Sequence, residues 1–142
     1  MKKKIFIFLL LGMIGIQFIK IDKTNPPVTA DLNAPAEVRT VLRNACYDCH
    51  SNETIWPWYS KVAPVSWMLE NHVKDGREKL NFSEWEKYND VKRSEMKKEI
   101  WEQINSSEMP LQMYTYLHSK ASLDIMKKKV IQDWATKKKP WE

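Results

Sequence analysis

The residues with the clearest chemical potential are Cys46 and Cys49, the only cysteines of the 142-residue chain, followed directly by His50. The C-x-x-C-H spacing is the attachment signature of a c-type haem, in which two thiols add to the porphyrin vinyl groups and the histidine binds iron. One helical turn suits this geometry, because residues three apart lie on the same face of a helix. The motif therefore predicts haem c as the cofactor, with Cys46, Cys49 and His50 as its binding residues.

Two other kinds of site share part of this pattern. A thioredoxin-like redox pair follows a strand in a βαβ unit, whereas the residues before Cys46 have a helical pattern. A structural zinc site needs four ligands, and the remaining histidines, His72 and His118, are unpaired and far apart in the sequence. The sequence argues against a redox pair and a zinc site but excludes neither.

Length and charge limit the class of protein. A chain of 142 residues has room for one domain, and its seven Trp, five Tyr and four Phe could pack around a large flat cofactor or form an ordinary core. Residues 1–20 hold four lysines and no acidic residue, which leaves 19 basic and 18 acidic residues in the rest of the chain. This balance does not have the excess positive charge of a nucleic-acid-binding domain, so no nucleic-acid partner is expected.

The N-terminus has the pattern of an export signal. Three lysines at residues 2–4 precede a mostly apolar run over residues 5–19, and no small-residue cleavage site follows. We therefore expect residues 1–19 to be a signal peptide or an uncleaved membrane anchor, with the domain on the periplasmic side. Residues 20–33 predict an extended linker, because Pro26 and Pro27 stand among polar residues. Residues 34–142 then form the haem-binding domain.

The domain is predicted to be all-α, with a cytochrome c-like arrangement of helices around one haem. Asn33 and Pro35 predict the start of a helix that ends at the haem motif, Pro64 and Gly76 bracket the next helix, and Ser83 to Glu86 matches a capping box. A charged helix is expected over residues 91–104 and a last helix after residue 122. The apolar stripes of these four long helices are Val38, Val41, Leu42 and Ala45; Val65, Met68, Leu69, His72 and Val73; Met96, Ile100 and Ile104; and Leu123, Met126, Val130 and Trp134.

Two further segments have a distinctive composition. Residues 56–59, Trp-Pro-Trp-Tyr, predict an aromatic loop that lies against the porphyrin or joins the core, because its proline disfavours a regular helix. The lysine runs 127–129 and 137–139 predict a solvated end to the last helix.

A second iron ligand is expected opposite His50. Met109 is the favoured candidate, because it directly precedes Pro110 in a non-helical segment and a proline keeps the preceding residue out of a helix. The methionines on the helix stripes are assigned to the core. An open site, without a second protein ligand, is a further alternative. The other candidates are Met68, Met96, Met113, Met126, His72 and His118.

Several stretches together resemble the bacterial haem-binding domain family, whose members are small exported or membrane-anchored proteins of the cytochrome c kind. The resemblance covers about residues 34–137 and implies an all-α haem c fold, with Cys46 and Cys49 as thioether sites and His50 as axial ligand. In class I cytochromes c a later Met-Pro pair supplies the sixth ligand, a role that the match gives to Met109. The matching stretches are Cys46 to Thr54, Trp56 to Ser60, Gly76-Arg77, Asn81 to Trp85 and Glu108-Met109-Pro110.

The predicted function is single-electron transfer in the periplasm with redox partner proteins, at a membrane reached through the N-terminal segment. No nucleophile–base pair accompanies the motif, and Ser51 beside a ligating His50 has no free base, so the sequence favours a carrier over an enzyme. The alternative is a haem-based peroxidase or a gas or redox sensor with an open or gated distal site. A third reading is a passive structural or zinc-binding domain.

Overall fold

The computed structural model describes residues 1–136, and every regular element in that range is helical, which confirms the all-α prediction. Residues 137–142, with the lysine run 137–139 and the predicted end of the domain, lie outside the described residues. The α-helices are α1 (Lys2–Gly15), α2 (Ala36–Ala45), α3 (Tyr47–His50), α4 (Val65–Lys79), α5 (Asp90–Asn105), α6 (Gln112–Leu117) and α7 (Ile125–Thr136), and the 3₁₀ helices are η1 (Ile16–Phe18), η2 (Trp58–Lys61), η3 (Phe82–Lys87) and η4 (Ser119–Ala121).

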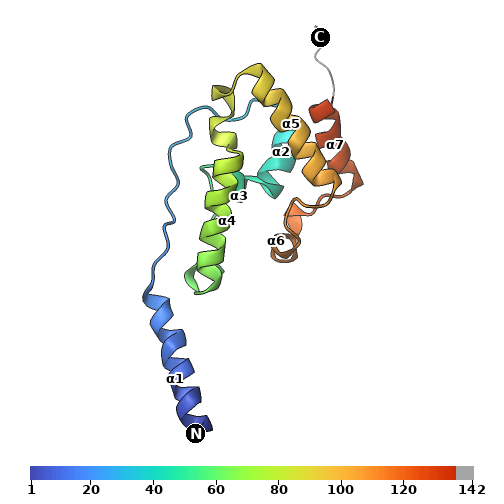
Figure 1. The fold of residues 1–142 in the computed structure, drawn as a ribbon. Coiled ribbons are helices and arrows are strands. Elements are labelled where there is room, and N and C mark those ends of the chain that lie inside the picture. The colour runs from blue at the N-terminus through green and yellow to red at the C-terminus, as the bar shows by residue number, and fades with distance from the viewer. Residues whose placement is uncertain (137–142) are drawn as a thin grey trace.

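The N-terminal helix α1 stands apart from the other helices, and the extended linker that follows it runs beside α4 (Figure 1). Every large apolar side chain of α1 is exposed, and these side chains surround the helix on all sides. Within residues 1–136, no helix combines the length and apolar composition that crossing a membrane requires. The linker is fixed to α4 at two points, where Glu70 accepts the N–H of Asp22 and Arg77 donates to the carbonyl of Thr24.

Helix α2 leads directly into the haem motif, as its apolar stripe predicts. Val38, Leu42 and Ala45 are buried, and Cys46 is the residue at which α2 ends and α3 begins. The predicted N-cap at Asn33 is wrong. The residue that precedes α2 is Pro35, which has no side-chain cap, while the backbone N–H of Asn33 donates to Glu86 instead. The loop between the linker and α2 is therefore held by a tertiary contact.

The hydrophobic core lies between α2, α5, α7 and η3. Tyr47 of the haem motif stacks on Phe82 with ring centroids 5.1 Å apart, and Phe82 in turn stacks on Trp85. The predicted α5 stripe of Met96, Ile100 and Ile104 is buried against this stack, as expected. This core joins the residues of the motif to the C-terminal helices.

The last helix presents a different face from the one predicted. Met126 is 74% exposed, whereas Ile131 is fully buried. The predicted stripe is right for Leu123, Val130 and Trp134, which pack against the core. The shift follows from where α7 begins, because Leu123 lies before the helix and so does not set its register.

Helix α4 also differs from the prediction. Its expected apolar face is largely open, since Val65 is 40% and Met68 41% exposed, and Val73 is the one apolar member of that stripe in the buried set. The helix does not end near Gly76 but continues to Lys79. Helix α4 packs on α3 near Gly76, where a Cβ would meet the backbone of Cys49. Helix α3 is too short to cover the N-terminal turns of α4 as well.

A short helix forms around Ser83 as predicted, but the predicted capping box is wrong because Ser83 does not cap this helix. The cap of η3 is Asn81, whose side chain accepts the N–H of Ser83. The Ser83 hydroxyl is buried and accepts the backbone N–H of Asn52, and the Asn81 side chain donates to that of Asn52. These bonds connect η3 to the segment that follows the haem motif.

Candidate haem site

The orientation of His50 is fixed by α4. Its Nδ1 atom lies 2.9 Å from the carbonyl oxygen of Gly76 and 3.2 Å from that of Leu80. Because carbonyl oxygens only accept hydrogen bonds, Nδ1 carries the hydrogen and Nε2 keeps its lone pair. Burial lowers the pKa of His50 and so favours the neutral ring. A neutral imidazole whose Nδ1–H is bonded to a backbone carbonyl is the form in which histidine binds a metal through Nε2.

Gly76 makes this arrangement possible. A Cβ atom at residue 76 would lie 2.5 Å from the carbonyl oxygen of Cys49 and 3.2 Å from the Cys49 Cβ. A side chain at this position is therefore excluded, and its absence brings the backbone of α4 against α3. The sequence signal was a glycine within an otherwise helical segment, which often marks close backbone approach.

Neither thiol of the motif is in a disulfide, and the surroundings of both differ from those of a reactive redox pair. Burial, with a smaller contribution from the Cys49 charge, raises the pKa of Cys46 to about 12. Burial and the neighbouring Asp48 carboxylate raise the pKa of Cys49 to about 11. Redox-active and zinc-binding cysteines need thiolates and lie in surroundings that lower the pKa, so this environment disfavours both alternatives. Within residues 1–136, no group of three or more His, Cys, Asp or Glu residues is arranged to hold a metal ion.

Two cavities, of about 400 and 190 Å³, lie beside His50. The larger has a mostly apolar wall, to which η3 and α5 contribute, and the smaller is lined by Cys49 together with residues of α4 and α6. Lys79 is a cation on the walls of both, where it could pair with the carboxylates of a bound ligand. The residues common to both cavities are Ala45, Cys46, His50, Lys79, Met109 and Pro110, and those that complete the apolar wall of the larger are Leu80, Phe82, Met96, Ile100 and Ile104.

The structure therefore brings all four predicted site residues together. Cys46, His50 and Met109 line both cavities, and Cys49 lines the smaller one. Met109 is half-buried in the bend between α5 and α6, and its backbone N–H donates to the carbonyl of Gln103 near the end of α5. These residues fit a haem, because an apolar cavity meets two thiols and an imidazole with a free Nε2. Their roles in attachment and ligation stay predictions.

Three of the other candidates for the sixth ligand, all methionines, line neither cavity. Met113 is 65% exposed on α6, and Met68 and Met126 are exposed rather than in the core as predicted. Met96 is buried as predicted but also lines the larger cavity. His72 lines the smaller cavity.

His118 belongs to an aromatic cluster that includes part of the predicted aromatic loop. Its ring stacks on Tyr114 with centroids 4.2 Å apart, and Tyr59 meets it edge-on. Trp58 is 77% exposed. No residue of the loop 56–59 lines either cavity beside His50.

Two contacts at the site were not predicted from the sequence. The Tyr114 hydroxyl donates to Oδ2 of Asp48 at 2.6 Å, which joins α6 to the middle of the haem motif. Burial and this hydrogen bond raise the pKa of Tyr114, so the phenol keeps its proton. Asp48 Oδ1 accepts the N–H of Ile55 in addition. The two contacts link residues separated by 66 and 7 positions, and the longer of them leaves no local pattern in the sequence.

Arg77 is the other site-supporting residue that the sequence did not single out for a role. Its guanidinium donates to the carbonyls of Ser51 and Thr24 and to the side chains of Asn25 and Thr54. It therefore ties the linker to the segment just after the motif. Its only sequence signal was its position next to Gly76.

The fold and site define a class: a small all-α protein in which a C-x-x-C-H turn faces an apolar cavity. The model of the haem-binding domain family matches residues 11–137, which is most of the chain, and the chain belongs to that family. It is therefore a haem-binding protein. Neither the curated proteins nor the solved structures include a match to this chain.

Proposed function

We propose that this chain is a c-type cytochrome that carries single electrons. The observation that supports this most is the hydrogen bond from His50 Nδ1 to Gly76, which leaves Nε2 free beside two thiols one helical turn apart. A lone C-x-x-C would not need an oriented imidazole. The neutral, directed ring next to the cysteines is the arrangement required for covalent attachment with axial ligation.

The chain's own residues have separate parts in this proposal. Cys46 and Cys49 would each hold the haem through one thioether bond, formed by addition of the thiol across a vinyl group, and His50 would bind the iron through Nε2. The apolar wall built by α5 and η3 keeps water away, which tunes the potential of a redox centre. The haem, when bound, supplies the one-electron chemistry. Met109, which lines the same cavities as His50, would offer its thioether as a second protein ligand to the iron, and a site with two protein ligands would carry electrons without binding a substrate.

The proposed location is the periplasmic side of the cytoplasmic membrane. Lys2, Lys3 and Lys4 precede a helix whose apolar side chains are exposed all around, a pattern typical of an export signal. The extended linker between α1 and α2 would separate the domain from the membrane surface. Covalent attachment through C-x-x-C-H fits this compartment. Partner proteins would exchange electrons with the domain there.

The test is the covalent bond. The protein is produced together with a haem-ligation system, extracted with acidified acetone and run on a denaturing gel stained for haem. We expect the haem to stay on the chain in the wild type. In Cys46→Ala or Cys49→Ala a single thioether bond should hold it, and the double variant should release it completely. Release of haem from the wild type would refute covalent attachment.

Carrier and enzyme are separated by a second measurement on the same protein. A carrier with two axial protein ligands gives a reversible one-electron titration and binds carbon monoxide slowly. Rapid binding of carbon monoxide by the wild type would instead favour a peroxidase or a sensor with an open site. Mass spectrometry of the native protein tests the location, since an intact N-terminus supports the anchor and a new N-terminus within residues 15–33 supports cleavage.

A further inference from the structure

A separate cavity of about 330 Å³ lies far along α4 from Gly76, where the linker, η2 and the first turn of α4 meet. Three lysines, Lys20, Lys23 and Lys61, are on its wall, and no acidic residue is. None of the three forms an ion pair or a hydrogen bond through its ammonium group in the part of the chain that the structure describes. Three like charges around one cavity repel one another unless an anion is present.

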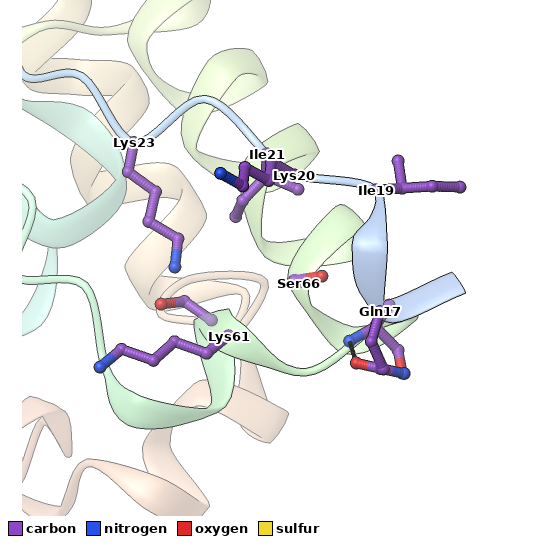
Figure 2. A pocket seen from close by; sticks show the side chains of 9 residues that line it. Gln17, Ile19, Lys20, Ile21, Lys23, Lys61 and Ser66 are labelled. Atoms are coloured by element: carbon purple, nitrogen blue, oxygen red, sulfur yellow. Dashed lines mark hydrogen bonds between the residues drawn. The ribbon is translucent and has the colours of Figure 1, made fainter. Parts of the chain in front are cut away.

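The base of this cavity has an unused polar group. Ser66 is 4% exposed and lines the cavity, and its hydroxyl has no hydrogen-bond partner among the described residues. In Figure 2 it lies between the linker that carries Lys20 and Lys23 and the segment that carries Lys61, and Lys23 points from the linker toward that segment. The hydroxyl of Ser66 is therefore free to donate a hydrogen bond to a group inside the cavity.

The cavity is held in shape by a double hydrogen bond. The side chain of Gln17 accepts the N–H of Ala63 at 2.9 Å and donates to its carbonyl at 3.1 Å. This pair fixes the residues just after α1 to the start of α4. The acidic residues nearby are engaged elsewhere, because Asp22 accepts the N–H of Thr24 and Glu70 accepts the N–H of Asp22. Neither carboxylate lines the cavity.

We propose that this cavity binds a phosphate group, with Ser66 donating a hydrogen bond from the base and Lys20, Lys23 and Lys61 pairing with the phosphate oxygens. Lysines bind phosphate as point charges, and several around one group add their attraction. Two sources offer this chemistry: the headgroup of an anionic phospholipid and a soluble phosphate ester. The apolar, exposed helix α1 ends next to the cavity, where a lipid phosphate would lie if α1 enters a bilayer.

The experiment uses the full-length haem-loaded protein. Partition into vesicles of phosphatidylcholine is compared with partition into vesicles that also contain phosphatidylglycerol. Helix α1, with its three lysines, is the same in every variant, so differences in this ratio between variants come from the substituted residues. The site variant K20Q/K23Q/K61Q is matched by K74Q/K120Q/K128Q, which removes the same charge from lysines that do not line the cavity. We expect the site variant to lower the ratio at least about tenfold more than the control variant.

A second arm titrates glycerol 3-phosphate into the same protein in neutral detergent. If glycerol 3-phosphate binds saturably and the site variant loses this binding, the cavity also takes soluble esters. If glycerol 3-phosphate does not bind but the protein prefers anionic vesicles, the cavity takes lipid. Ser66→Ala should weaken binding in whichever arm is positive by about threefold or more, without loss of helix content, because its hydroxyl has no partner to lose. Equal effects of the two triple variants, or wild-type binding by Ser66→Ala, would overturn the proposal.

Discussion

His50 donates its Nδ1–H to the carbonyl oxygen of Gly76 at 2.9 Å, and this contact depends on the absence of a side chain at residue 76. The same close approach places the carbonyl oxygen of Cys49 where a Cβ of residue 76 would be. A single glycine therefore determines both how α4 packs on α3 and which nitrogen of His50 is free. The orientation of His50 is therefore determined by α4, a helix outside the motif.

Gly76→Ala should consequently disturb the site. Its Cβ meets backbone atoms, which cannot rotate away, so α4 has to move from α3, at a cost of about 1–3 kcal/mol in the free energy of unfolding. The hydrogen bond to His50 should lengthen, and a weaker bond makes the imidazole a poorer donor to iron. Urea unfolding and redox titration of the loaded protein measure both effects. Gly12→Ala is the matched control, because a Cβ there meets nothing within 4 Å; equal stability of the two variants would contradict the argument.

The raised pKa values of the two thiols predict slow alkylation in the folded, haem-free protein. For Cys49 the shift from 9.0 to about 11 lowers the thiolate fraction at pH 8 by about a hundredfold, because each pKa unit is a factor of ten. Only the thiolate attacks iodoacetamide, so folded protein should react more slowly than urea-unfolded protein at that pH. The rate should rise as pH approaches 11. The variant Cys46→Ala isolates Cys49, and a folded rate equal to the unfolded one would refute the shift.

The part of the fold nearest the motif followed from local pattern. The stripe that contains Val38 and Leu42 predicted a helix ending at Cys46, because a period of 3.6 residues places these side chains on one face. Ile100 and Ile104 were predicted in the core for the same reason. The prediction that Met68 lies in the core was wrong. Periodicity identifies an apolar face without indicating what covers it, and α3 is too short to cover that end of α4.

The supports of the site could not be predicted in this way. The bond from His50 to Gly76 spans 26 residues, and that from Tyr114 to Asp48 spans 66. Neither leaves a periodic signal, because each depends on how separate helices pack. Cys46, Cys49 and His50 were identifiable because the chemistry of haem attachment fixes their types and local spacing, and Met109 was chosen because it directly precedes Pro110. Their neighbours are fixed by tertiary structure alone.

Arg77→Ala should destabilise the protein more than loss of an ordinary surface arginine. The side chain makes four hydrogen bonds, which connect the linker residues Thr24 and Asn25 to Ser51 and Thr54. Hydrogen bonds from a charged group each contribute about 1.5–3 kcal/mol, and exposure of two of these reduces the sum, so we expect a loss of roughly 2–4 kcal/mol in the free energy of unfolding. Urea unfolding followed by circular dichroism measures it.

Arg39→Ala is the control for this loss. Arg39 lies on α2, is exposed, and has no side-chain hydrogen bond or ion pair in the part of the chain that the structure describes. Its replacement should change the free energy of unfolding by less than about 0.5 kcal/mol. If both variants unfold alike, the linker does not contribute to stability through Arg77. Lys at residue 77 should restore only part of the stability, because it cannot reach four acceptors at once.

Met109→Ala should identify the sixth ligand. A thioether ligand favours reduced iron and gives oxidised protein a weak sulfur-to-iron charge-transfer band in the far red. The variant should lose this band, have a lower reduction potential and bind carbon monoxide rapidly. Met113→Leu, on an exposed side chain, should keep the band. Met96→Leu is the stricter control, because Met96 lines the same cavity; loss of the band there would assign the ligand to α5.

The hydrogen bond from Tyr114 to Asp48 predicts how Met109 is held. Helix α6 starts three residues after Met109, and the contact at 2.6 Å fastens its third residue, Tyr114, to the middle of the haem motif. Tyr114→Phe removes one hydroxyl and leaves the ring stacked on His118, so the free energy of unfolding should fall by only about 1–2 kcal/mol. The loop before α6 should nevertheless become less restrained, because the carboxylate loses its partner on α6.

The measurement is the far-red band of the oxidised protein across temperature. In Tyr114→Phe the band should disappear at a lower temperature than in the wild type, and before the helices unfold, since the restraint on Met109 is lost first. Tyr116→Phe, which removes a hydroxyl from a side chain 78% exposed on the same helix, should leave the band unchanged. Carbon monoxide should bind faster to Tyr114→Phe in proportion to the loss of the band. A band that disappears together with the helices in both variants would mean that Asp48 does not position Met109.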